Sequence, residues 1–172
     1  MRISATIITL NEQGNIARAI ESLRCADEVV VLDSGSSDQT IEAAARLGAR
    51  VVETPWRGYA GQKNFAAQQA THDWVLSIDA DEALSEALEA EIWQIKKNGP
   101  RFDAYTMPRM ARYLGRWILH SGWYPDRKVR CTTGARLIGW GSTFTNRFRW
   151  TGGSGTFTAT YSTTRAVRFP ST

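Results

Sequence analysis

The 172-residue chain is long enough for one domain with a buried core, and its 42% hydrophobic and 22% charged residues are ordinary for a soluble protein. The amino terminus lacks the basic start and apolar run of a signal peptide, and no apolar stretch approaches the roughly 20 residues of a transmembrane helix. Cys25 and Cys131 match no metal or redox spacing, so we expect two reduced thiols in a cytoplasmic protein.

The net charge of +4 hides an asymmetry along the chain. The first 126 residues carry 13 basic and 17 acidic side chains, a net charge of −4, whereas the last 46 carry 8 basic and no acidic ones. A basic end can touch phosphates or a membrane surface. Because it has few aromatic residues beside its arginines and no recognisable module, we expect no nucleic-acid partner.

Strands and helices alternate four times in the first half of the chain. Near-continuous apolar strands predict a parallel sheet that helices cover on both faces, an α/β fold. The predicted strands are 3–10, 28–32, 50–53 and 74–78.

Each predicted helix has an apolar face and a turn residue at one end. We expect Asn15 and Ser85 to cap the first and fourth helices, Gly48 to end the second, and the third to cover about residues 62–70. The expected inward-facing residues are Ile16, Ala19, Ile20, Leu23, Ile41, Ala44, Ala45, Leu88, Ile92 and Ile95.

Acidic or amide side chains follow three of the predicted strands. Asn11 and Glu12 follow the first, Asp33 the second, and Asp79 and Asp81 the fourth. Because ligands bind beyond the carboxyl ends of parallel strands, we expect one shared rim that forms the active site. Two carboxylates there suit a divalent metal, Mg²⁺ or Mn²⁺, that takes its other ligands from phosphate.

Several common chemistries lack their motifs in this sequence. No Gly-rich dinucleotide loop follows the first strand, no Gly-Lys-Ser/Thr loop exists, and no nucleophile elbow is present. A metal-bound diphosphate at a carboxylate rim instead favours glycosyl transfer from a nucleotide sugar. Lys63 is placed to add positive charge near the phosphates, and an ordinary surface lysine is the equally weighted alternative.

After residue 103 the amino-acid composition of the chain changes. Residues 105–109 fit a strand with an edge proline, Pro108. Residues 112–127 are dense in aromatic side chains and contain His120. Such residues either stack on sugar rings or pack a small subdomain, and the sequence favours neither.

Several motifs resemble family 2 glycosyltransferases, and two of them narrow the likeness to the branch of lipopolysaccharide core β-1,4-glucosyltransferases. The general motifs are TIITLNE at 6–12, DSGSSDQT at 33–40, GQKN at 61–64 and DADE at 79–82; the narrower ones are YLGRW at 113–117 and HSGWYPD at 120–126. The resemblance implies a GT-A-type, Rossmann-like fold and inversion at the anomeric carbon. It also implies UDP-glucose as donor, a heptose of the inner core as acceptor, and peripheral contact with the inner membrane.

The same resemblance implies roles for individual residues. Asp33 would contact the base of the nucleotide, Asp79 would lie near the ribose and bind with Asp81 at the metal site, and Asp81 would hold the metal. The remaining residues implied to line the nucleotide pocket are Thr9, Asn11 and Glu12.

Three parts are predicted: an α/β nucleotide-sugar-binding part at 1–100, an acceptor-side segment at 101–130, and an atypical tail at 131–172. The tail holds 11 Thr and 6 Gly but no Asp, Glu or Lys, unlike the resembled branch. We expect it to be irregular or β, and our hypothesis is that it comes from a shifted reading frame.

The catalytic base is assigned by elimination. Asp126 is the last carboxylate and the only one after Asp103. Its alternative role is that of a turn residue after Pro125, paired with Arg127. If the base lies instead in a part that this chain lacks, the chain would bind a nucleotide sugar without completing transfer.

Overall fold

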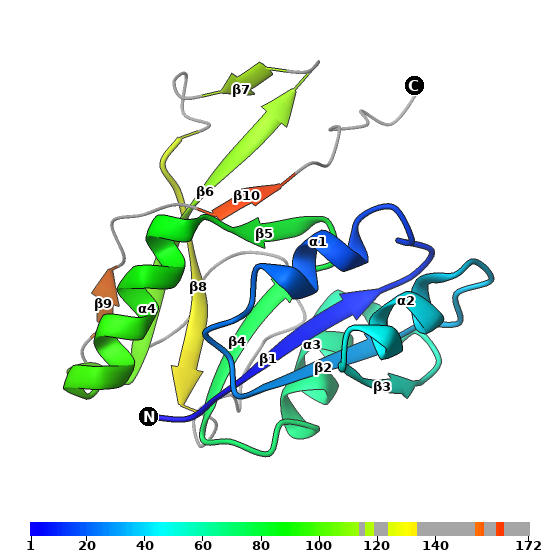
Figure 1. Cartoon of the computed structure of the whole chain (residues 1–172), viewed down its shortest axis with the longest axis horizontal. Helices are drawn as coiled ribbons and strands as arrows, with labels where there is room; N and C mark the ends of the chain where they lie inside the picture. The colour runs from blue at the N-terminus through cyan, green and yellow to red at the C-terminus, as the bar shows by residue number, and fades with distance from the viewer. Residues whose placement is uncertain (114–115, 119–123, 134–153, 157–160, 164–172) are drawn as a thin grey trace.

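The computed structural model describes residues 1–113, 116–118, 124–133, 154–156 and 161–163 (Figure 1). None of the helices in these ranges combines the length and the apolar character that crossing a membrane requires. The elements in chain order are β1 (Ile3–Thr9), α1 (Ile16–Glu21), β2 (Glu28–Asp33), α2 (Thr40–Arg46), β3 (Arg50–Glu53), α3 (Gly58–Gln68), β4 (Trp74–Asp79), β5 (Glu82–Leu84), α4 (Glu86–Asn98), β6 (Ala104–Tyr113), β7 (Arg116–Ile118), β8 (Asp126–Thr133), β9 (Ser154–Thr156) and β10 (Tyr161–Thr163).

The described strands form one mixed sheet in the order β3-β2-β1-β4-β8-β6-β10-β5, with β7 and β9 paired to β6. Strands β1 to β4 run parallel to one another because a helix returns the chain between each of them. Every residue of β1 is buried, as expected for a strand at the centre of a sheet with both faces covered. The α/β prediction is confirmed.

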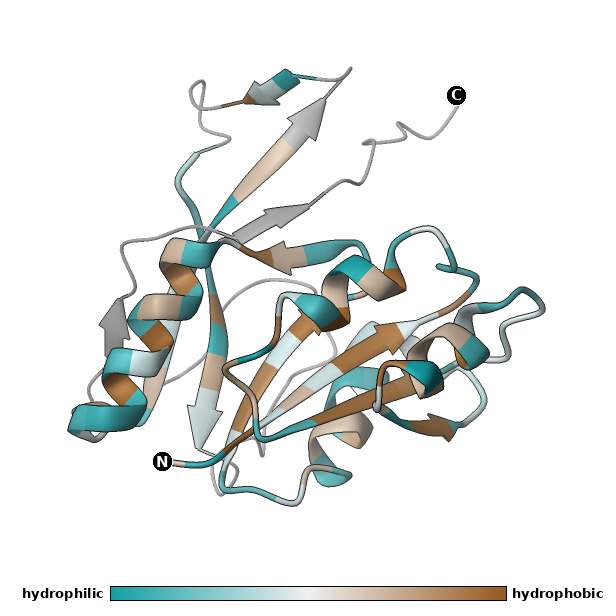
Figure 2. Ribbon diagram, viewed as in Figure 1, coloured by the Kyte–Doolittle hydropathy of each residue, from teal (hydrophilic) through white to brown (hydrophobic). Residues whose placement is uncertain are grey.

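The two faces of the parallel part carry separate apolar clusters. Ile7 belongs to the larger cluster with α1, α2 and α4, whereas the adjacent Ile8 belongs to a smaller cluster with Leu32 and Ala66 of α3. Since neighbouring side chains of a strand point to opposite faces, α3 covers the face opposite α1 and α2. Figure 1 shows this arrangement, and Figure 2 shows hydrophobic residues along the central strands.

The structure confirms some of the predicted helix caps and not others. Ser85 caps α4 by accepting a hydrogen bond from the Leu88 backbone N–H at 3.2 Å, and α4 ends before Gly99, whose φ of 83° suits glycine. Asn15 occupies the N-cap position of α1 as predicted, but its side chain makes no capping hydrogen bond, and its amide donates to Glu12 Oε2 instead.

Two further helix predictions are corrected. Helix α3 begins at Gly58, four residues before the predicted start, because glycine adopts the positive φ of 74° there. Ala45 of α2 is exposed, whereas Ala44 alone of the two alanines is buried. This short helix presents a narrower inner face than the sequence pattern indicates.

Antiparallel strands extend the sheet beyond β4. Strand β8 lies between β4 and β6 and is antiparallel to both. The prediction that Pro108 marks an edge strand is wrong, because β6 is an interior strand that pairs with β8, β9 and β10. Among the described residues, β6 pairs with β9 as far as Thr106 and with β10 from Arg109 onward, and Pro108 itself lies opposite Arg127 of β8.

Both cysteines are free thiols, as expected from their spacing, and the structure shows that both are buried. Cys25 and Cys131 belong to the larger apolar cluster. Burial raises the pKa of the Cys25 thiol to about 12 and also raises the pKa of the Cys131 thiol. Neither thiol is therefore a nucleophile at neutral pH.

Candidate functional site

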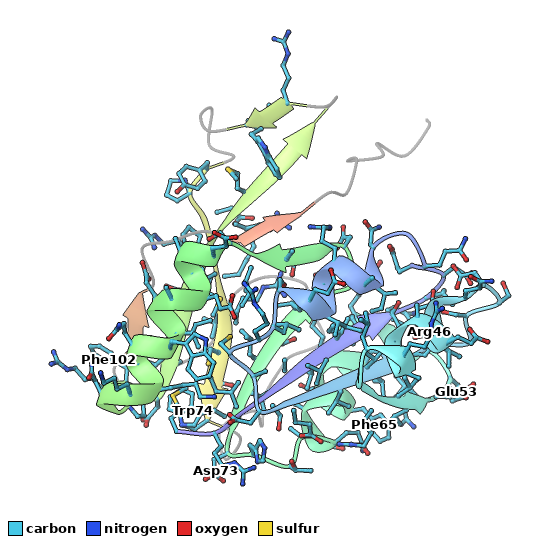
Figure 3. The ribbon with its side chains drawn as sticks, in the orientation of Figure 1. Arg46, Glu53, Phe65, Asp73, Trp74 and Phe102 are labelled. Atoms are coloured by element: carbon cyan, nitrogen blue, oxygen red, sulfur yellow. The ribbon has the colours of Figure 1, made fainter. Side chains whose placement is uncertain are left out.

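The strand ends that carry the predicted polar residues lie at one edge of the sheet. The β1–β2 register places Thr9 opposite Asp33, and the β1–β4 register places Ile8 opposite Asp79. Asp81 follows in the turn after β4. The structure therefore brings together the ends of β1, β2 and β4, and Figure 3 labels Asp73 and Trp74 at the opposite end of β4.

Asp33 organises its own turn. Its buried carboxylate accepts hydrogen bonds from the backbone N–H groups of Gly35 at 2.8 Å and Ser36 at 2.7 Å, and from Ser36 Oγ at 2.5 Å. Gly35 has a φ of 97°, which lets the chain turn back on the carboxylate. Asp33 thus fixes the loop that follows β2.

The loops after β1 and β2 are held to each other. The Asn11 backbone N–H donates to Ser36 Oγ at 2.8 Å, and the Ser37 N–H donates to Asn11 Oδ1 at 2.8 Å. The Glu12 N–H donates to Thr40 Oγ1 at 2.8 Å. Asn11 adopts the left-handed backbone conformation, with a φ of 53°, to make these contacts. The hydrogen bonds tie the loop after β1 to the loop after β2.

Thr9, which the resemblance assigns to the nucleotide pocket, is the last residue of β1. It is buried, and its Oγ1 makes no hydrogen bond within the described part of the chain. A buried hydroxyl without a protein partner is an unusual feature in a folded protein.

Lys63 and Asp79 form an ion pair at the same edge. Lys63 Nζ lies 2.7 Å from Asp79 Oδ1, and the lysine side chain is only 14% exposed. Burial lowers the pKa of Lys63. Burial alone would raise the pKa of Asp79, but the charges of Arg130 and Lys63 outweigh it and lower that pKa to about 2. Lys63 is therefore no ordinary surface lysine.

Arg130 and Glu82 complete this group, and the sequence analysis missed both. Arg130 NH2 lies 2.6 Å from Glu82 Oε1 and 3.6 Å from Asp79 Oδ2. The Asp79 N–H donates to Glu82 Oε2 at 2.9 Å. Burial and the charge of Asp79 raise the pKa of Glu82, against the opposing charge of Arg130. The available signal was the position of Glu82 directly after the two aspartates.

Asp126 lies at the start of β8, beyond the carboxyl end of β4, because β8 runs antiparallel to β4. Its carboxylate lies 2.6 Å from Arg109 NH2 and 2.8 Å from Lys128 Nζ. It is part of a strand rather than the turn residue considered as the alternative.

The acceptor-side aromatic segment is described only in part. Trp117 is 41% exposed on β7, and Tyr124 is half-buried. His120 and Trp123 lie outside the described residues, as do most residues of the predicted tail. The described pieces of the tail are all in strands: residues 131–133 at the end of β8, β9 and β10.

Comparison with known proteins identifies the family. The sequence model of Glycosyl transferase family 2 matches residues 4–165, nearly the whole chain. The chain belongs to glycosyltransferase family 2. The family resemblance in its motifs is thereby confirmed.

Two relatives within this family extend the comparison. The chain is 46% identical over 141 residues to the lipopolysaccharide core biosynthesis glycosyltransferase LpsC of Rhizobium meliloti. The matched region covers 79% of this chain and 50% of LpsC. The chain is also 48% identical over 117 residues to an uncharacterized glycosyltransferase of Rickettsia typhi, which covers 66% of this chain and 40% of that protein. This family 2 chain thus spans about half the length of these relatives or less.

Solved structures confirm the GT-A fold class. The chain is similar to residues 1–349 of S. aureus TarS, with a TM-score of 0.57 and 22% identity over 78% of this chain and 48% of that one. It is also similar to glucosyl-3-phosphoglycerate synthase from Mycobacterium tuberculosis, with a TM-score of 0.51 and 26% identity over 66% and 44% of the two chains. That synthase was solved with Mn²⁺, UDP and glucosyl-3-phosphoglycerate.

The residues of this family 2 site fit a divalent metal that substrate helps to hold. In the described part of the chain, no group of three or more His, Cys, Asp or Glu side chains could hold an ion. Mg²⁺ is commonly held by one or two carboxylates together with substrate phosphates, so a full protein cage is not required. Asp81 is half-buried, and Arg18 fixes its turn by donating to the Asp81 carbonyl at 2.8 Å.

Proposed function

We propose that this chain transfers a hexose from UDP-glucose to a saccharide acceptor such as the inner core of lipopolysaccharide, with inversion and with a divalent metal. The observation that carries the proposal is the Lys63–Asp79 ion pair beside Asp81, at the edge where the Asp33 strand also ends. The mycobacterial synthase that binds Mn²⁺ and UDP, and the LpsC relative named for lipopolysaccharide core biosynthesis, support it.

The donor nucleotide would lie over the joined loops after β1 and β2. We assign Asp33 to the base, with Thr9, Asn11 and Glu12 lining the pocket. Because Asp33 Oδ1 already accepts two hydrogen bonds and Oδ2 one, its contact with the base would use the remaining acceptor capacity of Oδ2. The unpartnered Thr9 Oγ1 supports a ligand nearby.

The diphosphate would lie between Lys63 and Asp81. Asp81 would hold the metal together with phosphate oxygens, and the bound metal would neutralise the charge that develops on the departing diphosphate. Lys63 would add a second positive charge there. Asp79 is engaged by Lys63 and lies near Arg130, so its contacts favour the ribose role over metal ligation.

Asp126 is our candidate for the general base. It would accept the proton of the acceptor hydroxyl while that oxygen bonds to the anomeric carbon and the bond to the diphosphate breaks. One displacement of this kind inverts the anomeric carbon. Asp126 would have to exchange part of its contact with Arg109 or Lys128 for the hydroxyl.

The alternative function is a protein that binds a nucleotide sugar without completing transfer. One observation favours it: the carboxylate of the candidate base is already held by two cations, Arg109 and Lys128. It differs from the first proposal only in turnover.

The deciding experiment measures binding and turnover separately on the purified chain. Calorimetry with UDP and UDP-glucose, in Mn²⁺ and then in EDTA, should show metal-dependent binding of both. Release of UDP from UDP-glucose, with and without a core oligosaccharide acceptor, should then show acceptor-dependent turnover. Binding without turnover would support the alternative, and no binding of either nucleotide would refute both.

The basic carboxyl-terminal part suggests a place of action. We propose that the protein works in the cytoplasm with peripheral contact to the inner membrane, because its last 46 residues carry 8 basic and no acidic side chains. Co-sedimentation with vesicles containing phosphatidylglycerol should be stronger than with neutral vesicles and should weaken with salt. Equal binding to both vesicle types would contradict the electrostatic contact.

A further inference from the structure

Four charged side chains from four elements form a row beneath the site edge. Lys63 comes from α3, Asp79 from β4, Glu82 from β5 and Arg130 from β8. The charges alternate along the row, with 2.7 Å from Lys63 to Asp79, 3.6 Å from Asp79 to Arg130 and 2.6 Å from Arg130 to Glu82. The arginine and the glutamate are only 6% and 2% exposed.

Arg130 lies at a β-bulge between β6 and β8. On β6, the consecutive residues Tyr105 and Thr106 pair with Cys131 and Val129 of β8, so Arg130 is the extra residue between them. A bulge changes the direction of a side chain relative to the regular alternation of a strand. Arg130 also precedes Cys131, which pairs with Leu76 of β4, and its side chain contacts Ser77 and Asp79 near the end of that strand.

Arg130 is anchored at two points besides Asp79. Its NH1 donates to the Ser77 carbonyl at 3.3 Å, and its NH2 donates to Glu82 Oε1. The second oxygen of Glu82 accepts the Asp79 N–H. The guanidinium and the backbone at Asp79 are thus fixed to the same carboxylate.

A buried ion pair of this kind is a weak source of stability. Replacement of a buried pair by neutral groups of similar shape is often neutral or stabilising, whereas removal of one partner leaves an uncompensated charge. Stabilising the contact between β8 and β5 therefore does not by itself explain the Arg130–Glu82 pair, and we look for its role at the site.

We propose that Arg130 is a positioning residue for the donor: anchored by Glu82, it fixes the orientation of Asp79, and together with Lys63 presents that carboxylate to the nucleotide. This rests on the proposed function for the identity of the donor. The residue acts through Asp79 and Glu82, without contact with the reacting atoms.

The test compares variants by calorimetry with UDP and Mn²⁺ as the probe. Arg130→Met alone would leave Glu82 charged and buried, so the informative variant is Arg130→Met with Glu82→Gln, which keeps the shape and removes both charges. Its melting temperature and circular dichroism should match the wild type, while its Kd for UDP rises about tenfold or more. Arg127→Met, an exposed arginine of the same strand, is the matched control and should bind UDP as the wild type does.

Calorimetry also separates positioning from a structural defect. A purely structural defect lowers the number of binding sites per chain and leaves the Kd of the folded fraction unchanged, whereas positioning changes Kd at full stoichiometry. Arg130→Lys keeps the charge but loses the fork of donors, so it should recover part of the affinity.

Two results would overturn this inference and leave the proposed function standing. One is a folded double variant whose Kd for UDP is within about twofold of the wild-type value. The other is a double variant that binds less UDP only because it has fewer binding sites per chain, with an unchanged Kd. If the double variant does not fold, Arg130→Lys decides, and wild-type affinity in that variant overturns the inference. A wild-type chain that fails to bind UDP would overturn the proposed function and this inference with it.

Discussion

Asp126 Oδ2 lies 2.6 Å from Arg109 NH2, across the register that pairs these two residues of β8 and β6. Lys128 holds the other carboxylate oxygen at 2.8 Å. The candidate base is therefore fixed in place by two cations. This arrangement orients the carboxylate but also competes with an acceptor hydroxyl for it.

The first prediction concerns Asp126→Asn. The amide keeps the shape of the side chain but does not accept a proton, so kcat should fall by about 10²- to 10⁴-fold. The Kd for UDP should stay unchanged, because Asp126 is assigned to the acceptor side. The measurements are acceptor-dependent UDP release at saturating donor and calorimetry with UDP. Undiminished turnover in this variant would exclude Asp126 as the base.

The second prediction concerns the metal site. Asp81→Asn should abolish the Mn²⁺-dependent part of UDP binding and turnover while leaving the fold intact, because the half-buried side chain lies in the turn at the rim. Calorimetry with and without Mn²⁺ measures this directly. Asp73→Asn is the matched control, since this exposed aspartate precedes the other end of the same strand (Figure 3). Wild-type metal dependence in Asp81→Asn would place the metal elsewhere.

The alternation of strands and helices could be predicted because it rests on local patterns. Apolar runs such as 29–32 determine where strands lie, and the parallel order then brings the strand ends together. Asp33 and Asp79 could therefore be assigned to one edge from the sequence alone. The start of α3 could not, because it depends on the positive φ of Gly58.

The Arg130–Glu82 contact could not be predicted for a different reason. These two residues are 48 positions apart, and they come together where β8 pairs with β4, at a strand position that also forms a bulge against β6. Neither feature leaves a periodic signal in the sequence. The pairing of Asp126 with Arg109 depends in the same way on the register of β6 and β8.

The third prediction concerns the loop after β2. Asp33→Ala removes the acceptor of three hydrogen bonds and should lower the free energy of unfolding by about 1–3 kcal/mol. It should also weaken UDP binding more than it slows turnover at saturating donor. Ser36→Ala removes one of the three donors and should have a smaller effect on stability. Urea unfolding and donor titrations measure the two effects, and an equal loss of turnover at saturating donor would contradict the binding role.

The fourth prediction concerns a carboxylate far from the site, at the start of β2. Glu28 accepts hydrogen bonds from Ser4 Oγ at 2.7 Å, from the Thr71 N–H and Oγ1 at 3.1 and 2.8 Å, and from Arg50 NH2 at 2.9 Å. Burial raises the pKa of Glu28, but these contacts outweigh it and lower the pKa from 4.5 to about 2. The ionised carboxylate therefore ties β1, β3 and the loop before β4 to β2.

The sign of the pH dependence follows from this lowered pKa. The unfolded state takes up the proton first as the pH falls, so the contribution of Glu28 is complete above pH 4.5 and is lost as the pH approaches about 2. Glu28→Gln should cost about 1–2 kcal/mol in urea unfolding at neutral pH, and the difference from the wild type should shrink below pH 4.5. Glu21→Gln, an exposed residue of α1, should change stability little at any pH. A Glu28→Gln deficit that stays constant between neutral pH and pH 3 would show that the lost interaction does not depend on the charge of Glu28.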